Sequence, residues 1–231
     1  MTRSIKRHIP DHVVPRGWWT PELQSALEAI PTSVWRESVL SERDTLNCLR
    51  HFKPVDTRVV IVGQDPYPSP GKANGLAFGV RDDWVGDRLR SSSGNVAREA
   101  SMIGAVRSGY DFTLESWAKQ GVLLLNCDLS VAEGKPGSHR GVWREVVRCI
   151  LNQLPVGVVY AGFGARGAKL AYAERGVLSP CVGGVTHPCR YSAEQGTATL
   201  GAFVGSDIFG RISRALAEAG RPPVKWTQHE L

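Results

Sequence analysis

The segment Gly63-Gln64-Asp65-Pro66-Tyr67 combines residue types and spacing that could do chemistry. It follows an apolar run at residues 59–62, which predicts a buried strand. Pro66 fixes its own φ and keeps Asp65 out of the helical region, so a carboxylate is presented in a tight turn. Ligands of open α/β sheets bind at the carboxyl ends of strands, where this turn would lie. Asp65 is therefore a candidate for acid–base or electrostatic catalysis, with a solvated turn residue as the alternative.

Two more polar residues follow predicted strands. Asn126 ends the apolar run at residues 121–126, and His187 follows the run at residues 181–185. If the strands are parallel, Asp65, Asn126 and His187 lie on one rim of the sheet. Asn126 could instead cap a strand end, and His187 could be a turn histidine that contacts the backbone. Three groups of different chemistry at one ligand-binding edge are more specific than any one of them.

Short strands and helices in alternation must position these residues. The sequence predicts strands at residues 58–62, 121–126, 156–160 and 181–185, and helices at residues 94–108, 113–120, 141–153, 165–174 and 207–219. This alternation is typical of βαβ units, and continuous apolar runs fit strands buried on both faces. We therefore expect an α/β fold with a central, mainly parallel four-stranded sheet.

The chain has no internal repeat and no low-complexity linker. Residues 1–231 are expected to form a single domain, in which residues 1–30 are an N-terminal extension. A short helix is predicted near residues 21–30, and helical periodicity continues over residues 33–52.

The 231-residue chain has a net charge of +6, because 28 Lys and Arg residues outnumber 22 Asp and Glu residues. This excess favours an acidic partner, most commonly nucleic acid. Five cysteines without a Cys-x-x-Cys pair argue against a disulfide framework, a zinc site or an iron–sulfur site, and they fit reduced thiols inside a cell. No apolar run is long enough to predict a membrane span, and the basic residues 1–8 predict a disordered arm rather than a secretory signal. We expect no metal, no cofactor and no membrane partner.

Several motifs occur in the order and spacing of the family 1 uracil-DNA glycosylases, which the chain resembles from about residue 57 to residue 226. The matching positions are Gly63-Gln64-Asp65-Pro66-Tyr67, residues 70–78, residues 121–126, Ser138-His139 with Trp143, His187-Pro188 with Ser192-Ala193, and Gly205-Ser206 with Phe209. The resemblance implies a three-layer α/β/α fold. It also implies a monofunctional DNA glycosylase, a hydrolase that breaks the N-glycosidic bond of flipped-out uracil and leaves an abasic site in base-excision repair.

The same resemblance implies that uracil-containing DNA is the partner and that no cofactor is needed. One active site per chain makes a monomer sufficient. A protein inhibitor of the DNA-facing groove and replication proteins are further candidate partners. We expect an intracellular location, which would be the cytoplasm for a bacterial protein and the nucleus or an infected host cell for a eukaryotic or viral one.

The resemblance assigns catalysis to Asp65 and His187. Asp65 would stabilise the positive charge that develops on the sugar and orient the attacking water. His187 would donate a hydrogen bond to the uracil oxygen on which negative charge grows. It would do so best as a neutral imidazole, which requires a lowered pKa.

Four residues are implied in uracil binding. The Asn126 amide offers a donor and an acceptor that match the N3–H and O4 of uracil, whereas cytosine reverses this edge. Phe78 would stack on the base, and Tyr67 would exclude the methyl group of thymine. Gln64 would contribute backbone N–H groups.

DNA contacts are expected from Ser92, Ser93, Ser192 and Arg190, because hydroxyls and cations position phosphates. Tyr191 occupies the position of the intercalating leucine of the family. It could fill the gap left by the flipped nucleotide, or it could be an ordinary surface aromatic.

The chain departs from the family pattern at two places that bear on activity. Pro68 replaces the histidine that usually follows the Gln-Asp-Pro-Tyr unit, a change that poxvirus members share, and residues 187–192 read His-Pro-Cys-Arg-Tyr-Ser. The departures leave two alternatives: a glycosylase for another modified base, and a catalytically silent DNA-binding or replication-accessory homologue. The retained pocket residues argue against the first alternative, and the retained catalytic pair argues against the second.

Overall fold

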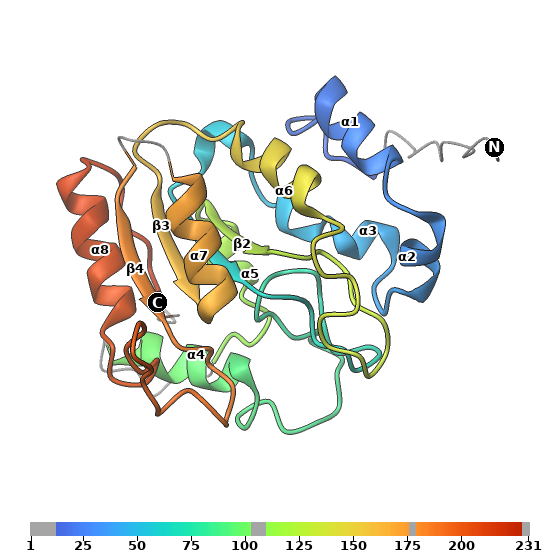
Figure 1. Ribbon diagram of the computed structural model, residues 1–231. Coiled ribbons are helices and arrows are strands. Elements are labelled where there is room, and N and C mark those ends of the chain that lie inside the picture. The colour runs from blue at the N-terminus through green and yellow to red at the C-terminus, as the bar shows by residue number, and fades with distance from the viewer. Residues whose placement is uncertain (1–12, 103–109, 176–178, 228–231) are drawn as a thin grey trace.

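The computed structural model describes residues 13–102, 110–175 and 179–227. Its strands β1 (Val59–Gly63), β2 (Val122–Asn126), β3 (Val159–Phe163) and β4 (Cys181–Val185) form one sheet in the order β2-β1-β3-β4 (Figure 1). Every neighbouring pair is parallel. Strands β1, β2 and β3 are buried at each position, which explains their continuous apolar sequences. The predicted α/β fold with a parallel four-stranded sheet is confirmed.

Helices cover both faces of this sheet. They are α1 (Pro21–Glu28), α2 (Thr32–Glu37), α3 (Glu42–Thr45), α4 (Ser92–Ser101), α5 (Glu115–Ala118), α6 (Arg144–Leu151), α7 (Ala165–Glu174) and α8 (Ile208–Glu218), with 3-10 turns at Asn47–Leu49 and Pro54–Asp56. Helix α7 packs against β1, β3 and β4, and the right-handed crossover from β2 to β3 places α6 on the same face. Helix α5 packs against β2 on the opposite face, and α4 contacts α8. Trp117 of α5 contacts Phe209 of α8 with ring centroids 5.2 Å apart, so α8 shares the second face. The result is three layers.

Several predicted boundaries were wrong for local reasons. The periodicity over residues 33–52 forms α2, α3 and a 3-10 turn rather than one helix, because Ser38 is extended and the Ser41 hydroxyl caps a new helix by accepting the Asp44 N–H. The third strand begins at Val159 instead of residue 156, because Gly157 adopts φ +81° in a preceding turn. The strand also continues past the predicted end at residue 160, through Gly162 and Phe163.

The other elements lie close to their predicted positions. Helix α7 and strand β4 have the predicted bounds, whereas α5 and α6 are shorter at both ends. Helix α4 begins at Ser92 because the Ser91 hydroxyl accepts the Gly94 N–H, at 3.4 Å. Its predicted extension past residue 102 and the predicted arm at residues 1–8 lie outside the described residues.

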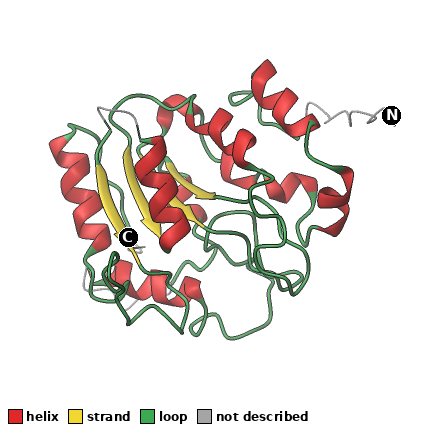
Figure 2. Ribbon diagram, in the orientation of Figure 1, coloured by secondary structure: helices red, strands yellow, loops and turns green. Residues whose placement is uncertain are grey.

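The described part of the N-terminal extension packs against the rest of the chain. Trp18 is buried, and its indole N–H donates to the Phe52 carbonyl at 2.9 Å. Leu23 and Leu27 of α1 are also fully buried, since this helix packs against α6. None of the helices in the described ranges has the length and apolar character needed to cross a membrane. Loops lie beyond the carboxyl ends of the strands (Figure 2). Most of the predicted site residues lie in these loops, whereas Asn126 ends β2 and Ser92 and Ser93 begin α4.

Candidate active site

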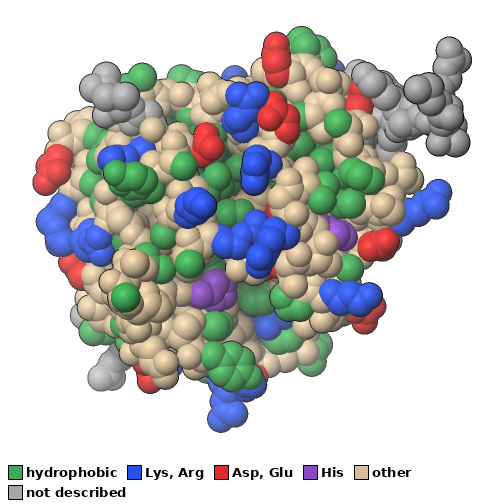
Figure 3. All heavy atoms as spheres, viewed as in Figure 1, with side chains coloured by type: hydrophobic (Ala, Val, Ile, Leu, Met, Phe, Trp, Pro, Cys, Tyr) green, Lys and Arg blue, Asp and Glu red, His purple; other side chains and the backbone are tan. Residues whose placement is uncertain are grey.

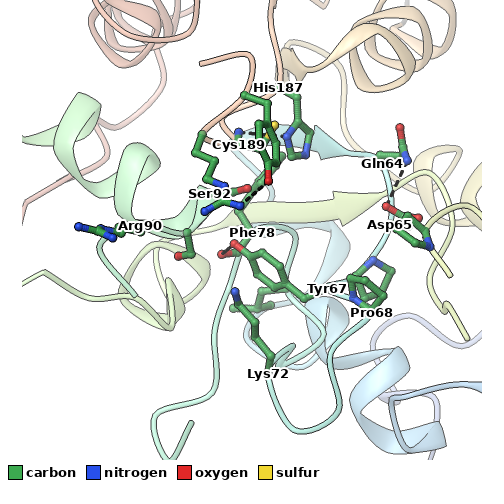
Figure 4. A pocket seen from close by; sticks show the side chains of 16 residues that line it. Gln64, Asp65, Tyr67, Pro68, Lys72, Phe78, Arg90, Ser92, His187 and Cys189 are labelled. Atoms are coloured by element: carbon green, nitrogen blue, oxygen red, sulfur yellow. Dashed lines mark hydrogen bonds between the residues drawn. The ribbon is translucent and has the colours of Figure 1, made fainter. Parts of the chain in front are cut away.

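A cavity of about 610 Å³ lies at the carboxyl ends of the strands. The predicted residues that line it are Gln64, Asp65, Tyr67, Phe78, Ser92, His187, Arg190 and Tyr191 (Figure 4). Lys and Arg side chains run through the middle of the molecular face in Figure 3. Segments more than 120 positions apart in the sequence thus meet at one concave site, as ligand-binding sites of α/β sheets do.

The Asp65 carboxylate is held in the turn after β1. Its Oδ2 accepts the Gly137 N–H at 2.6 Å, and its Oδ1 accepts a hydrogen bond from Gln64 Nε2 at 3.3 Å. Burial raises the pKa of Asp65, and these two hydrogen bonds oppose that effect. The carboxylate is therefore oriented by fixed donors while it borders the cavity.

The His187 ring is held as a neutral hydrogen-bond donor. Its Nδ1 accepts the Cys189 N–H at 3.1 Å, so the ring proton of the neutral form is on Nε2. Burial lowers the pKa of His187 to about 4, so the imidazole is uncharged at neutral pH. The lowered pKa that a neutral donor requires is thus present.

Tyr67 and Phe78 both line the cavity and are joined by a hydrogen bond. The Tyr67 hydroxyl donates to the Phe78 carbonyl at 3.3 Å and accepts the Ser93 N–H at 3.0 Å. Phe78 has φ +67°, a conformation that non-glycine residues rarely adopt and that often marks a functional site. Its ring packs against Phe163 and His187, at centroid distances of 5.4 and 5.7 Å. These contacts fix both aromatic rings before any ligand binds.

Asn126 lies beside the cavity rather than among its lining residues. It is buried at the end of β2, in register with Gly63 of β1. A Cβ at Gly63 would lie 2.3 Å from Asn126 Oδ1 and 3.1 Å from Phe78 Cζ. The glycine of the first motif therefore leaves the space in which the amide and the aromatic ring approach each other. The sequence motif included Gly63, but the reason for a glycine there is the approach of Asn126 from the neighbouring strand β2.

The serines predicted to contact DNA differ in their surroundings. Ser92 lines the cavity at the start of α4. Ser93 is fully buried, and its hydroxyl donates to the Phe112 carbonyl at 3.1 Å, so the predicted phosphate contact does not fit this side chain. The Ser192 hydroxyl donates to the His187 carbonyl at 2.8 Å, which holds the loop that carries the histidine. Ser92 and Ser93 are both buried, at 6% and 0% exposure, and sequence alone could not show that only Ser92 borders the cavity.

The loop at residues 187–192 presents Arg190 and Tyr191 at the cavity. Tyr191 is 72% exposed, and the Arg190 guanidinium stacks over its ring at 4.6 Å from the centroid. The loop is tied to α4, because the buried Asn95 side-chain amide donates to the Pro188 carbonyl at 2.7 Å. Asn95 is a positioning residue that the sequence did not single out.

Sequence reasoning also missed a cation in the wall of the cavity. Lys72 Nζ lies 4.4 Å from the ring centroids of both Tyr67 and Trp84. Burial lowers the pKa of Lys72. Arg90 and Arg190 also line the cavity, so three basic side chains border it. A lysine in a Pro-Gly-Lys-Ala loop carries no signal of this placement.

Pro68 also lines the cavity, where the family usually has histidine. Its carbonyl accepts the Gly134 N–H at 3.0 Å, so the turn remains connected to the loop after β2. Among the residues that the structure describes, no group of three or more His, Cys, Asp or Glu side chains could hold a metal ion.

Comparison with known proteins identifies the family. A uracil-DNA glycosylase from Klebsiella pneumoniae is 37% identical over 192 residues, which cover 80% of this chain and 79% of the relative. One from Deinococcus deserti is 36% identical over 192 residues, covering 79% and 71%. The chain belongs to the uracil-DNA glycosylase family. No protein-family model matches it.

Solved structures of uracil-DNA glycosylases share the fold. The crystal structure of mimivirus uracil-DNA glycosylase has a TM-score of 0.78 and 21% identity, covering 95% of this chain and 90% of that chain. A variant of the mimivirus enzyme in complex with UGI also has a TM-score of 0.78, at 20% identity over 94% and 90%. The predicted resemblance to uracil-DNA glycosylases and the fold that it implied are therefore confirmed.

Proposed function

We propose that this member of the uracil-DNA glycosylase family hydrolyses the N-glycosidic bond of uracil that has flipped out of DNA. The product is an abasic site, which base-excision repair then processes. The observation that carries the proposal is the pairing of Asp65 and His187 at one cavity, with the histidine held neutral and its donor on Nε2. The identity to curated uracil-DNA glycosylases over about four fifths of the chain supports it.

Uracil selection would follow from the walls of the cavity. The flipped base would stack on Phe78, while Tyr67 stands where the methyl group of thymine would project. The hydroxyl of Tyr67 is held at two points, so this ring would resist displacement. The Asn126 amide would pair with N3–H and O4, and cytosine would leave both partners unsatisfied. Backbone N–H groups near Gln64 would bind the remaining base oxygen.

Bond breaking would separate charge between the sugar and the base. As the C1′–N1 bond breaks, its electron pair stays on uracil and the sugar becomes an oxocarbenium-like cation. The His187 Nε2–H would donate to the uracil oxygen that becomes negative, without transferring its proton. Asp65 would stabilise the cation and accept the proton of the water whose oxygen bonds to C1′. The uracil anion then leaves and takes up a proton, which completes the hydrolysis.

DNA would bind across the mouth of this cavity. Ser92, Arg90 and Lys72 are suitable phosphate contacts, because they border the cavity in a chain of net positive charge. Tyr191, exposed beside Arg190, would fill the gap left by the flipped nucleotide. We propose that residues 1–231 act as a single domain and as a monomer, in whichever compartment holds the DNA. A protein inhibitor or a replication partner would compete for this same groove.

The test is excision from a labelled oligonucleotide with a single uracil, as a single strand and paired with A or G. The abasic product is revealed by alkaline cleavage, without added metal. We expect Asp65→Asn to lower the rate by about 100-fold or more, the size typical of a preorganised charged group. Asp82→Asn is the matched control, because the Asp82 side chain is 91% exposed.

The outcome separates the alternatives. No excision by a wild type that still binds DNA would support the catalytically silent homologue. A more than tenfold preference for thymine, 5-hydroxymethyluracil or hypoxanthine over uracil would indicate a glycosylase for another base.

A further inference from the structure

An ion pair between a buried carboxylate and a half-buried guanidinium lies behind the candidate catalytic carboxylate. Arg166 Nη1 is 2.6 Å from Asp128 Oδ2, and the two side chains are 26% and 1% exposed. Asp128 follows β2 by two residues, and Arg166 lies in the first turn of α7, just after β3. Strand β1 runs between β2 and β3 and ends at the turn that carries Asp65. The pair therefore bridges the two strands that flank the catalytic turn.

Hydrogen bonds connect this pair to Asp65 by two routes. The Asp128 N–H donates to the Gln64 carbonyl at 3.0 Å, next to the catalytic residue. Asp128 Oδ1 accepts the Gly141 N–H at 2.7 Å, and the same turn donates the Gly137 N–H to Asp65 Oδ2 at 2.6 Å. Asp128 thus holds the far end of the turn whose near end orients the carboxylate.

The two charges of the pair also act on Asp65 directly. The Asp128 carboxylate raises the pKa of Asp65, and the Arg166 guanidinium lowers it. The Cys127 thiol near Asp65 stays neutral, because burial raises its pKa to about 11. His187, which shares the cavity with Asp65, is also neutral at pH 7. Lys72, Arg90 and Arg190 line the same cavity. Among the causes that shift the pKa of Asp65, Asp128 and Arg166 are the charged side chains with the largest effects.

We propose that the Asp128–Arg166 pair is a positioning device for Asp65, fixing the turn that holds the carboxylate and balancing the charge behind it. The inference rests on the proposed function, in which Asp65 acts on the substrate. Neither partner touches the cavity, so both act through Asp65 rather than on DNA or uracil. Because the Asp128 carboxylate is buried, removing the Arg166 cation would leave a buried charge without its partner, which is costly.

Removing one charge of the pair at a time should change the pKa of Asp65 in opposite directions. Asp128→Asn keeps an oxygen for the Gly141 N–H but leaves the Arg166 cation unopposed, so the pKa of Asp65 should fall. Arg166→Gln leaves the Asp128 anion unopposed, so the pKa of Asp65 should rise. We expect a change of about 0.5 to 1 pH unit in each direction, the size of a nearby charge at the effective dielectric of protein interiors. If the pair only stabilised the turn mechanically, the change in the Asp65 pKa would not have opposite signs in the two variants.

The experiment measures the Asp65 carboxyl directly and through activity. Carbon-13 NMR titration of labelled Asp side chains, with the resonance identified by its loss in Asp65→Asn, gives the pKa in the wild type and both variants. Single-turnover excision of uracil from pH 4 to 8 gives the acidic limb of the rate profile. Arg166→Lys should stay near the wild type, and the double variant Asp128→Asn/Arg166→Gln should return toward it.

The inference is supported if the Asp65 pKa falls in Asp128→Asn and rises in Arg166→Gln, and if the acidic limb of the rate profile shifts in the same direction as the pKa. Displacements in the same direction, or none in folded variants, would overturn it. If Arg166→Gln does not fold, Asp128→Asn decides alone, and an Asp65 pKa that does not fall overturns the inference. Because the NMR titration needs no activity, a wild type that fails to excise uracil would contradict the proposed function while this test still gives its answer.

Discussion

Replacement of His187 by Gln should change how the free energy of unfolding depends on pH. The wild-type ring is buried and its Nδ1 accepts the Cys189 N–H, so protonation in the folded state would break that bond and charge a buried group. Burial therefore lowers the pKa of folded His187 from 6.5 to about 4. The unfolded chain takes up a proton on this residue at higher pH than the folded chain does. Folding stability is accordingly highest above pH 6.5 and falls as the pH drops from 6.5 towards 4.

The size of the effect follows from the two pKa values of His187. Each pH unit of difference corresponds to about 1.4 kcal/mol, so the full effect approaches about 3 kcal/mol below pH 4. At pH 5.5, where the unfolded histidine is about 90% protonated and the folded one hardly at all, the expected loss is about 1.4 kcal/mol. The raised pKa of Asp65 acts in the opposite direction over acidic pH, because the folded state then binds the proton first. The comparison must therefore be between wild type and variant, not between two pH values of the wild type.

Urea unfolding followed by tryptophan fluorescence at pH 7.5, 6.5 and 5.5 measures this difference for the wild type and His187→Gln. Glutamine retains an oxygen that can accept the Cys189 N–H but does not titrate. We expect the wild type to lose about 1.3 kcal/mol more than the variant between pH 7.5 and 5.5. Equal losses in the two proteins, or an NMR titration midpoint of the His187 ring near 6.5, would refute the reasoning. The neutral-donor role would then lose its physical basis.

Two further predictions concern residues around the cavity. Gly63→Ala would place a Cβ 2.3 Å from Asn126 Oδ1, so we expect about 1–3 kcal/mol of destabilisation and at least a tenfold loss of uracil excision. Gly201→Ala, whose Cβ meets nothing within 4 Å, should leave both properties unchanged, and equal behaviour of the two variants would contradict the steric argument. Lys72→Met keeps the apolar stem but removes the charge, so the slope of log affinity for DNA against log salt should become shallower by about 0.7–0.9, as for one lost phosphate contact. An unchanged slope would show that Lys72 does not meet a phosphate.

The sequence by itself determined the sheet and the order of its functional turns. Continuous apolar runs predicted four buried strands, and β1, β2 and β3 are buried at every position, whereas β4 is buried only at Val185. Strand β4 and helix α7 have the predicted bounds because their signals are local. The same rule placed Asp65 and His187 after their strands and Asn126 at the end of its strand. Local signals were weakest where turns compete with periodicity, as at Gly157 and Ser41, and there the predicted boundaries were wrong.

Only the tertiary structure decided how these turns work together. The Asn126 side chain occupies the space left by the missing side chain of Gly63. This arrangement depends on the register of β1 and β2, which side-chain periodicity does not specify. The neutral state of His187 depends on burial by segments distant in the chain, and so do the buried position of Ser93 and the pairing of Asp128 with Arg166. Periodicity reports which face of a strand or helix is buried, whereas pKa values and hydrogen-bond partners depend on which groups from other segments arrive at that face. The sequence thus named the candidate catalytic side chains, and the packing of the loops around them set their charge and orientation.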